Sequence, residues 1–306
     1  MRRPFVKNQF SDNIWNVLAC PCCCRRLVRN GDDGALCAHC QTAYAYTDSG
    51  SLDLRLKKQR TYGLQFQLGV HLPPDDLTTF GPLRTHPSPE VAFSGIKVPY
   101  HLTAEILSHF PKARGKGSLV LDLGCGDAIH RTVCEYAGFE YAGLDYDSSG
   151  APFLGDAHAL PFADSSFEFI LSIAVLEHIR FPFVMMREAH RVLQPGGHFI
   201  GTVAFLEPFH LDSYYHHSHL GTLNSLQYAG FKAHQIAPHE EWTVLKAQAV
   251  MALFPGMPRR FSEMLVVPLQ AFHRLWWQAR RLKNPKLDLN ERIRNTSGSF
   301  AFIATR

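Results

Sequence analysis

Apolar residues between positions 119 and 204 are concentrated in short, predominantly apolar runs that are separated by glycine or polar residues. The first run begins at Leu119 and ends in a glycine turn, which is followed by a helical pattern at 128–136. Similar runs occupy 139–145, 167–173 and 198–204, and a helix precedes the last of these. Such runs are typical of strands buried on both faces of a parallel sheet. The pattern therefore predicts an α/β domain.

The last third of the chain continues this pattern after an interruption. A helix is predicted at 220–229 and a strand at 231–236, and the final strand comes only at 299–305. Consecutive strands are normally joined by a short link, so we interpret 238–298 as a helical insertion. Within it, Pro268 suits the first turn of a helix. The apolar face of that helix would consist of Leu269, Phe272, Leu275, Trp276 and Ala279.

Two interpretations of this helix remain open from the sequence. Its apolar face could pack on the rest of the chain, with the arginines in solvent. Alternatively, residues 261–284 could contact a membrane surface or a lipid-linked substrate, because Trp and Arg together suit an interface.

Composition limits the class of protein. A chain of 306 residues with 46% apolar content can bury a full α/β core and one or two small additions. Its beginning lacks the apolar segment of a secretory leader, and no uncharged apolar run reaches the length of a membrane span. We therefore expect a cytoplasmic protein, with the inner membrane face as an alternative site of peripheral attachment.

Positive charge is concentrated near the C-terminus. Residues 257–294 carry nine Lys or Arg against three acids, a local +6, whereas the whole chain has a net charge of +4, so the remainder carries −2. A basic surface is thus local, which argues against a protein that coats nucleic acid along its whole face.

Cysteines cluster near the N-terminus in two CxxC pairs. Cys20 and Cys23 form the first pair, and Cys37 and Cys40 form the second after thirteen intervening residues. In a reducing compartment this spacing predicts two knuckles whose four thiolates bind one structural Zn²⁺. Four thiolates close the coordination shell, so this zinc would not be catalytic. Two further cysteines, Cys22 and Cys24, could replace Cys23 only by shifting the register of the knuckle.

The segment around these cysteines resembles the small zinc-ribbon activator subunit of tRNA and translation-factor methyltransferases. The matching residues are Leu18, Cys20, Pro21, Cys23, Leu36, Cys37, Cys40 and Tyr44. We therefore divide the chain into a zinc ribbon at 1–56, a linker or cap at 57–99 and a larger domain at 100–306.

Five short motifs occur in order along the larger domain. They are the glycine turn at 122–127, an acidic strand end at Asp145, the LPF sequence at 160–162, the LEH sequence at 176–178 and the RVLQPGG sequence at 191–197. Together they resemble class I S-adenosylmethionine-dependent methyltransferases. The resemblance implies a Rossmann-like, seven-stranded sheet with S-adenosyl-L-methionine as cofactor, and the helical insertion would precede the last strand.

The resemblance also implies roles for particular residues. It assigns the turn at Asp122, Gly124, Cys125 and Gly126 to the methionine end of the cofactor. Asp145 would bind the ribose, Asp156 and the Ala157 backbone would contact the adenine, and Ile173 would lie beside the sulfonium. Only ten residues separate Asp145 from Asp156, so we expect the crossover helix between the second and third strands to be missing.

Two histidines are candidates for the general base. His178 follows the fourth strand, close to the expected methyl position, and Glu177 could orient its ring. Alternatively, the Glu-His pair shapes the pocket wall. His210 lies on the loop after the fifth strand. A catalytic metal is not expected, because Ala174 occupies the position where ubiquinone-type O-methyltransferases have a further acid.

Three functions follow from these observations. The leading hypothesis is a methyltransferase that modifies a hydroxyl of a small metabolite, glycan or lipid-linked saccharide. The second is an rRNA or tRNA base methyltransferase that uses the zinc ribbon to recognise RNA, although the position of the basic charge makes nucleic acid a weaker candidate partner. The third is a cofactor-binding scaffold without catalysis, whose partner protein the sequence does not identify.

Overall fold

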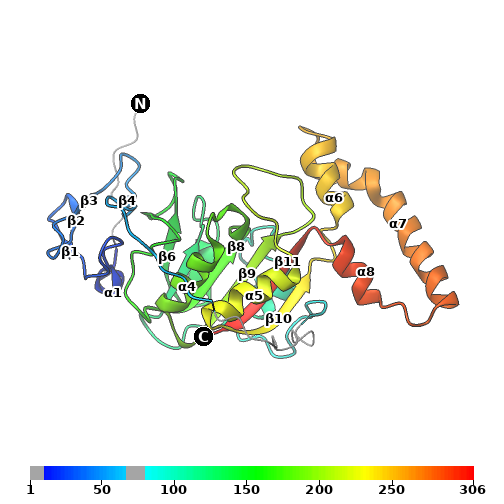
Figure 1. Cartoon of the computed structure of the whole chain (residues 1–306), viewed down its shortest axis with the longest axis horizontal. Helices are drawn as coiled ribbons and strands as arrows, with labels where there is room; N and C mark the ends of the chain where they lie inside the picture. The colour runs from blue at the N-terminus through cyan, green and yellow to red at the C-terminus, as the bar shows by residue number, and fades with distance from the viewer. Residues whose placement is uncertain (1–9, 67–79) are drawn as a thin grey trace.

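The computed structural model describes residues 10–66 and 80–306 (Figure 1). Its centre is an eight-stranded sheet in the order β10-β11-β9-β8-β5-β6-β7-β4. From one edge to the other, the strands are β10 (Lys232–Pro238), β11 (Ser299–Thr305), β9 (Leu193–Ala204), β8 (Phe167–Ile173), β5 (Leu119–Leu123), β6 (Glu140–Asp145), β7 (Phe153–Leu154) and β4 (Leu52–Asp53).

Strand direction in this sheet agrees with the predicted Rossmann-like fold. All neighbouring strands are parallel except β11, which runs antiparallel to both β9 and β10. The seven strands from β10 to β7 therefore form the expected sheet, and the α/β class is confirmed. The eighth strand, β4, comes from the cysteine-rich N-terminal segment and was not expected there.

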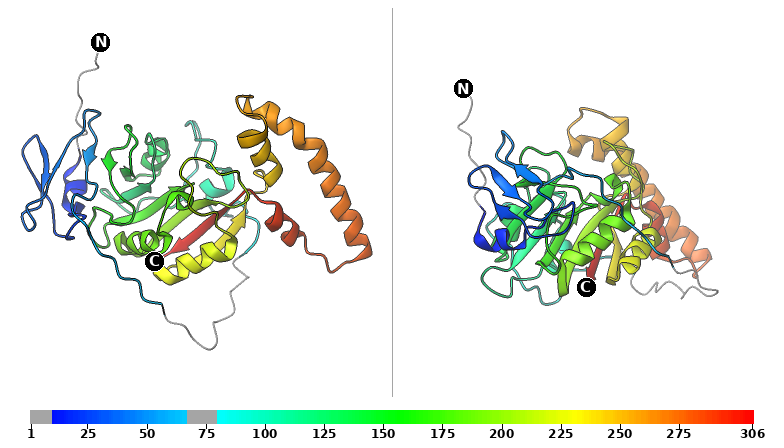
Figure 2. Two further views of the ribbon diagram at one scale, coloured as in Figure 1. Left: turned by 45° about the horizontal axis from the view of Figure 1, so that its top comes forward. Right: turned by 60° about the vertical axis from the view of Figure 1, so that its left-hand side comes forward.

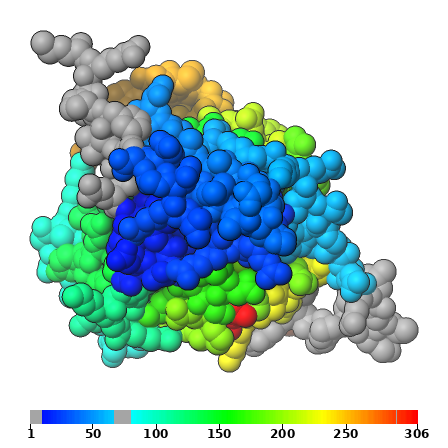
Figure 3. Space-filling model, turned by 90° about the vertical axis from the view of Figure 1, so that its left-hand side faces the viewer, coloured from blue at the N-terminus to red at the C-terminus, as the bar shows by residue number. Residues whose placement is uncertain are grey.

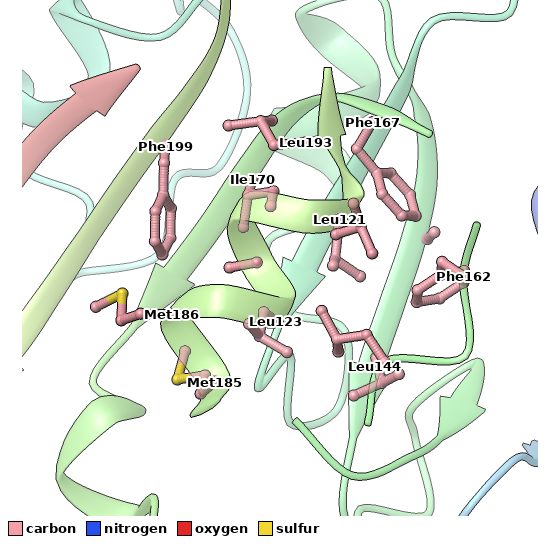
Figure 4. Close-up of a cluster of buried hydrophobic side chains, with 14 of the residues drawn as sticks. Leu121, Leu123, Leu144, Phe162, Phe167, Ile170, Met185, Met186, Leu193 and Phe199 are labelled. Carbon is pink, nitrogen blue, oxygen red and sulfur yellow. The ribbon is translucent and has the colours of Figure 1, made fainter. Parts of the chain in front are cut away.

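The central strands are apolar because both faces of the sheet are covered. Every residue of β5 and β8 is buried. Helix α4 (Pro182–Val192) lies against one face, and Figure 4 shows its Met185 and Met186 beside Leu123 and Phe199 of the sheet, within one buried cluster. α3 (Arg131–Tyr136) and α5 (His219–Ala229) complete the helices that follow strands β5 and β9. Burial on both faces gives the continuous apolar runs seen in the sequence.

One helix begins later than predicted. The helical pattern at 128–136 becomes α3 only from Arg131, because Ala128 has a φ of +57°. This left-handed conformation is incompatible with a right-handed helix, so the turn extends three residues further than the sequence indicated. By contrast, α5 agrees with its prediction, since Ser218 caps its start and Gly230 ends it with a φ of +100°.

The crossover between β6 and β7 contains no helix, as expected. These two strands are parallel, and the connecting residues 146–152 form only turns and bends. β7 is correspondingly short, at two residues. The sheet therefore has a truncated edge at this point.

The N-terminal module, residues 10–54, covers that edge. It contains α1 (Asp12–Val17) and a small antiparallel sheet of β1 (Val28–Arg29), β2 (Gly34–Leu36) and β3 (Ala43–Ala45). It ends in β4, where the Leu52 N–H donates to the Pro152 carbonyl at 3.0 Å and the Leu54 N–H donates to that of Leu154 at 2.7 Å. Figure 3 shows the module spread over this end of the molecule.

The insertion lies at the opposite end of the sheet. It contains α6 (Val244–Gln248), the π-helical turn η3 (Ala249–Leu253), α7 (Arg259–Lys283) and α8 (Leu289–Thr296). The remaining helices are α2 (Ala104–Ser108) and the 3₁₀ turn η2 (Leu176–His178). In Figure 1, α7 extends away from the sheet. Within the described ranges, 10–66 and 80–306, we find no helix with the length and apolar content to cross a bilayer.

The prediction for Pro268 was wrong. It does not start a helix but lies well inside α7, which begins nine residues earlier, directly after Pro258. Pro258 is the residue that marks the start, because a proline before the first turn costs no intrahelical hydrogen bond. Pro268 has no N–H to donate to the preceding turn, and it lies on the exposed side of α7.

Candidate active site

The glycine turn after β5 leaves backbone atoms open to a ligand. Gly126 has a φ of +51°, and a Cβ built there would meet nothing within 4 Å, whereas one on Gly124 would lie 2.3 Å from Val175 Cγ2. Gly124 is thus required by packing, and Gly126 keeps space free beside the backbone. The Gly126 N–H donates to Asp145 Oδ2 at 2.9 Å, which connects the first two predicted motifs directly.

Asp145 also organises the loop that follows it. Its Oδ1 accepts hydrogen bonds from the N–H groups of Asp147 and Ser148, at 3.3 and 3.2 Å. Tyr146 and Asp147 line the same cavity as Asp145, so the truncated crossover forms part of the cavity wall.

Asp156 is held by a hydrogen-bonded histidine. His158 Nδ1 lies 2.6 Å from Asp156 Oδ1, and its Nε2 accepts a hydrogen bond from the Phe181 N–H at 3.0 Å. Because Nε2 is an acceptor, Nδ1 must carry the proton and donate it to Asp156. Burial alone would raise the pKa of Asp156, but the hydrogen bonds from His158 outweigh it and lower the pKa overall. No motif or spacing in the sequence indicates this role for His158.

Three of the predicted cofactor residues lie behind the cavity wall. Cys125 and Ile173 are buried and do not line the cavity. The Asp122 carboxylate is fully buried, accepts a hydrogen bond from Tyr141 at 2.5 Å and lies 3.1 Å from His130 Nδ1. Asp122 therefore supports the glycine turn from behind, and its assignment to the cofactor remains a prediction. The signal for this arrangement was the apolar run itself, since a carboxylate inside a buried strand needs partners.

One cavity of about 1050 Å³ brings together the remaining predicted cofactor residues and His178, whereas His210 is not among the residues that line it. Gly124, Gly126, Asp145, Asp156 and Ala157 line one part of it, and Ala174, His178, Leu211, Asp212 and Tyr214 line another. These side chains come from the ends of β5, β6 and β8 and from the loop at 205–218. Ligand sites of open α/β sheets form at the carboxyl ends of the strands in this way.

The linker after the N-terminal module also contributes to the cavity. Arg60, Tyr62 and Leu64 line it. The Arg60 guanidinium donates to the Pro21 carbonyl at 3.1 Å and lies 3.9 Å from the buried Glu188 carboxylate of α4. Arg60 thus joins the cysteine-rich knuckle to the larger domain beside the cavity. The sequence predicted a linker or cap at 57–99 without indicating these residues, because the segment has no periodic pattern.

The two candidate histidines lie next to each other. The ring centroids of His178 and His210 are 5.1 Å apart, and the rings are nearly perpendicular at 82°. Burial lowers the pKa of His178, and the neighbouring His210 lowers it further. His178 is therefore neutral near pH 7 and has an imidazole nitrogen available to accept a proton.

Glu177 does not orient His178 through a hydrogen bond, which the sequence had suggested. Its side chain has no solvent exposure, and neither carboxylate oxygen has a hydrogen-bond partner among the described residues. Burial raises its pKa to about 7, although the nearby N–H groups of Glu177 itself and Ala204 offset part of that effect. Glu177, His178 and His210 place one donor atom each within 4.8 Å of one another. This donor set could hold a divalent cation, and sequence spacing could not reveal it because His210 comes from a distant loop.

The N-terminal cysteines converge as predicted. Four sulfur atoms lie within 4.8 Å of one another, those of Cys20, Cys23, Cys37 and Cys40. The Cys20–Cys40 and Cys23–Cys37 sulfur separations are 3.6 and 3.5 Å, and all four thiols are free. Four thiolates at about 2.3 Å from a zinc ion would lie about 3.8 Å apart, so this geometry fits a tetrahedral site.

The two extra cysteines lie outside this group. Cys22 Sγ is 3.4 Å from the Tyr44 hydroxyl, and Cys24 is exposed with a φ of +60°.

Comparison with known proteins agrees with the motifs. Residues 121–201 match the family model of a methyltransferase domain. The chain is 35% identical over 101 residues to an uncharacterised methyltransferase of Mycobacterium marinum (28% of this chain, 40% of that protein). It is 34% identical over 124 residues to a fatty-acid O-methyltransferase of Mycolicibacterium smegmatis (34% and 42%). The chain thus spans about two fifths of the length of these curated relatives. A solved S-adenosylmethionine-dependent methyltransferase of Mesorhizobium loti is 17% identical, with a TM-score of 0.40 over 64% of this chain and 94% of that chain.

Proposed function

We propose that this protein transfers a methyl group from S-adenosyl-L-methionine to an oxygen atom of a small metabolite, a glycan or a lipid-linked saccharide. The observation that carries this proposal is the single cavity that contains the glycine turn, Asp145 and Asp156 in one part and His178 in another. The family match at 121–201 supports the activity, and the fatty-acid O-methyltransferase among the relatives supports an oxygen acceptor.

The residues on the cofactor side fit the proposed cofactor. The Asp145 carboxylate accepts three hydrogen bonds from backbone N–H groups. A carboxylate has about four acceptor positions, so Asp145 can also accept a bond from a ribose hydroxyl. The free space beside Gly126 permits close approach of a ligand to the backbone. When bound, S-adenosylmethionine supplies an electrophilic methyl group on a sulfonium.

His178 is the proposed base on the acceptor side. A hydroxyl is a weak nucleophile, and loss of its proton to the neutral His178 ring makes the oxygen more reactive as the new C–O bond forms. Tyr214, which lines the same cavity, would confine the acceptor near this ring, and the linker residues Arg60 and Tyr62 would limit the access of water. A carboxylate acceptor would not need the base, because it is already ionised at neutral pH.

We further propose that the four converging cysteines bind a structural zinc ion. This zinc would hold the N-terminal module together and thereby position Arg60 at the cavity, through the Pro21 carbonyl. It would have no direct part in catalysis, since its coordination shell is closed.

The test is methyl transfer from labelled S-adenosylmethionine by the full chain. Fractionated extracts of lipid, glycan, small metabolites and undermethylated RNA would serve as acceptors, and the matched inactive control is Asp145→Asn, which keeps the size of the side chain. We expect label in a lipid, glycan or metabolite fraction. Label in RNA alone would favour the base methyltransferase hypothesis. Tight cofactor binding without transfer to any fraction would favour the scaffold hypothesis.

A metal-dependent mechanism can be distinguished in the same assay. The zinc-loaded enzyme would be treated with EDTA and passed through gel filtration, and its zinc content would be measured to establish that one ion per chain remains. If His178 acts as a base, this enzyme should keep its activity. Loss of activity that Mg²⁺ or Mn²⁺ restores would instead assign Glu177, His178 and His210 to a divalent cation.

A further inference from the structure

Helix α7 has one face that packs on the protein and another that faces solvent. Ser262, Val266 and Gln270 recur every four residues and are buried against the rest of the insertion. The Gln270 amide donates a hydrogen bond to Thr243, the N-cap of α6. This contact fixes which side of α7 points outward.

The outward side is apolar. It carries large apolar residues at spacings of three and four, which place them on one surface of a helix. Each is between 53 and 64% exposed, and together they form the outer face: Phe261, Met264, Leu265, Leu269, Phe272, Leu275 and Trp276. An exposed apolar face of about 23 Å along a helix is rare on a protein that has no partner for it. Figures 1 and 2 show α7 extending away from the sheet, in agreement with the exposure of this face among the described residues.

Basic side chains border the outer face. α7 contains six Lys or Arg and one acid, Glu263, which pairs with Arg259. The other five cations have no ion-pair partner among residues 10–66 and 80–306, namely Arg260, Arg274, Arg280, Arg281 and Lys283. Arg260, Arg274 and Arg281 repeat at multiples of seven, so they lie on one side of the outer face.

We propose that the outer face of α7 docks on a lipid bilayer that carries anionic headgroups. The apolar residues would enter the interfacial region, the adjoining cations would contact the headgroups, and Trp276 suits the boundary between them. A second copy of the chain is a poorer occupant, because a symmetric contact between two outer faces would bring their like-charged borders together. The proposal concerns binding alone and holds whether or not the chain transfers methyl groups.

Docking would also connect the membrane to the cavity. Trp242, at the base of the insertion, donates a hydrogen bond to Glu207 at 2.7 Å, and Glu207 belongs to the loop whose residues Leu211 and Tyr214 line the cavity. Under the proposed function, a lipid-borne acceptor would therefore approach from the side where the enzyme is docked.

Vesicle sedimentation with the full chain tests the proposal. The probes are vesicles of phosphatidylcholine mixed with phosphatidylglycerol, and vesicles of phosphatidylcholine alone. We expect binding to the mixed vesicles that falls as salt is raised, and weaker binding to the neutral ones. The double variant Phe272→Ser/Leu275→Ser should bind at least about tenfold more weakly, because it removes two apolar side chains that would enter the bilayer interface on docking.

Val267→Ser is the matched control. Val267 is 50% exposed on the same helix, but it lies in the stripe of Arg260, Arg274 and Arg281 rather than on the outer face, so binding should change little. Circular dichroism would establish that both variants fold like the parent chain. Equal binding by the parent and the double variant would overturn the proposal.

Sedimentation equilibrium without lipid separates the other occupants. If the parent chain forms a dimer and binds no vesicles, and the double variant is a monomer, the outer face binds a second copy of the chain and the proposal is wrong. A monomer that binds neither vesicle would mean that the face serves a protein partner, and the proposal would be wrong.

Discussion

At the scale of single residues, the site depends on how burial changes the protonation of a few groups. Burial and the neighbouring His210 both lower the pKa of His178, so the ring stays neutral throughout the neutral range. A general base works only in its unprotonated form. Under the proposed function, low pH should therefore inhibit methyl transfer only once it falls below the ordinary histidine pKa of about 6.5.

This argument predicts the behaviour of His178→Gln with a hydroxyl acceptor. The turnover number should fall about a hundredfold or more, the usual contribution of a positioned base, and the acidic limb of the pH profile should disappear. Cofactor affinity, measured by calorimetry, should stay within about twofold of the parent value, since no cofactor contact is assigned to the ring. Equal losses in turnover and cofactor affinity would make His178 part of the pocket wall instead.

Glu177 predicts a pH dependence of stability. Its pKa is raised by burial to about 7 in the folded protein, from an ordinary value of 4.5. Between these two values the unfolded chain ionises while the folded chain stays protonated, so stability falls as the pH rises and the loss is complete above pH 7. The shift corresponds to about 3 kcal/mol.

Glu177→Gln should remove this dependence. At pH 8 the variant should be more stable than the parent by about 2 to 3 kcal/mol, and the difference should disappear near pH 4.5. Urea unfolding at several pH values would measure it. A constant difference at every pH would mean that the Glu177 pKa is not raised.

At the scale of elements, the cysteine knuckle depends on register. Cys23 belongs to the converging group, whereas Cys22 faces Tyr44 from outside it. Cys23→Ser should therefore reduce bound zinc well below one ion per chain, and Cys22→Ser should leave one. Atomic absorption on chains purified under reducing conditions measures this. Equal loss in both variants would show that the register is different.

Elements that sequence reasoning placed correctly are those defined by local patterns. Strands β8 and β11 span the predicted residues because most of their positions are apolar and nearly all are buried. The start of α3 was missed because the left-handed backbone of Ala128 has no sequence signal. In α7, the sequence showed the apolar periodicity but not whether the apolar face packs on the protein or faces solvent. Periodicity alone does not distinguish these two orientations of the helix.

At the scale of the whole molecule, the N-terminal module and the larger domain share one hydrophobic core. Leu18, Leu27 and Tyr44 of the module belong to the same buried cluster as Leu121 and Phe162 of the larger domain. In addition, β4 completes the sheet beside β7, and Phe10 stacks on Phe153 with ring centroids 4.3 Å apart. The two parts should therefore unfold together.

Zinc removal tests this coupling. With a chelator and a reductant present, the whole chain should still unfold in a single calorimetric transition, but at a midpoint lower by about 10 °C, because loss of the metal destabilises the shared core. The zinc-loaded chain is the control. A separate early transition, with the main one unchanged, would show that the module is an independent domain.

The sequence by itself determined the α/β class, the succession of the main strands along the chain, the four converging cysteines and the acidic residues at the cavity. Each of these is encoded by local spacing or by an apolar run, and parallel strand ends necessarily meet at one edge. Only the tertiary structure decided that β4 completes the sheet, that Arg60 reaches the cavity and that His210 joins His178. These contacts join residues that are distant in the chain, and their geometry depends on packing of the whole fold rather than on any local pattern.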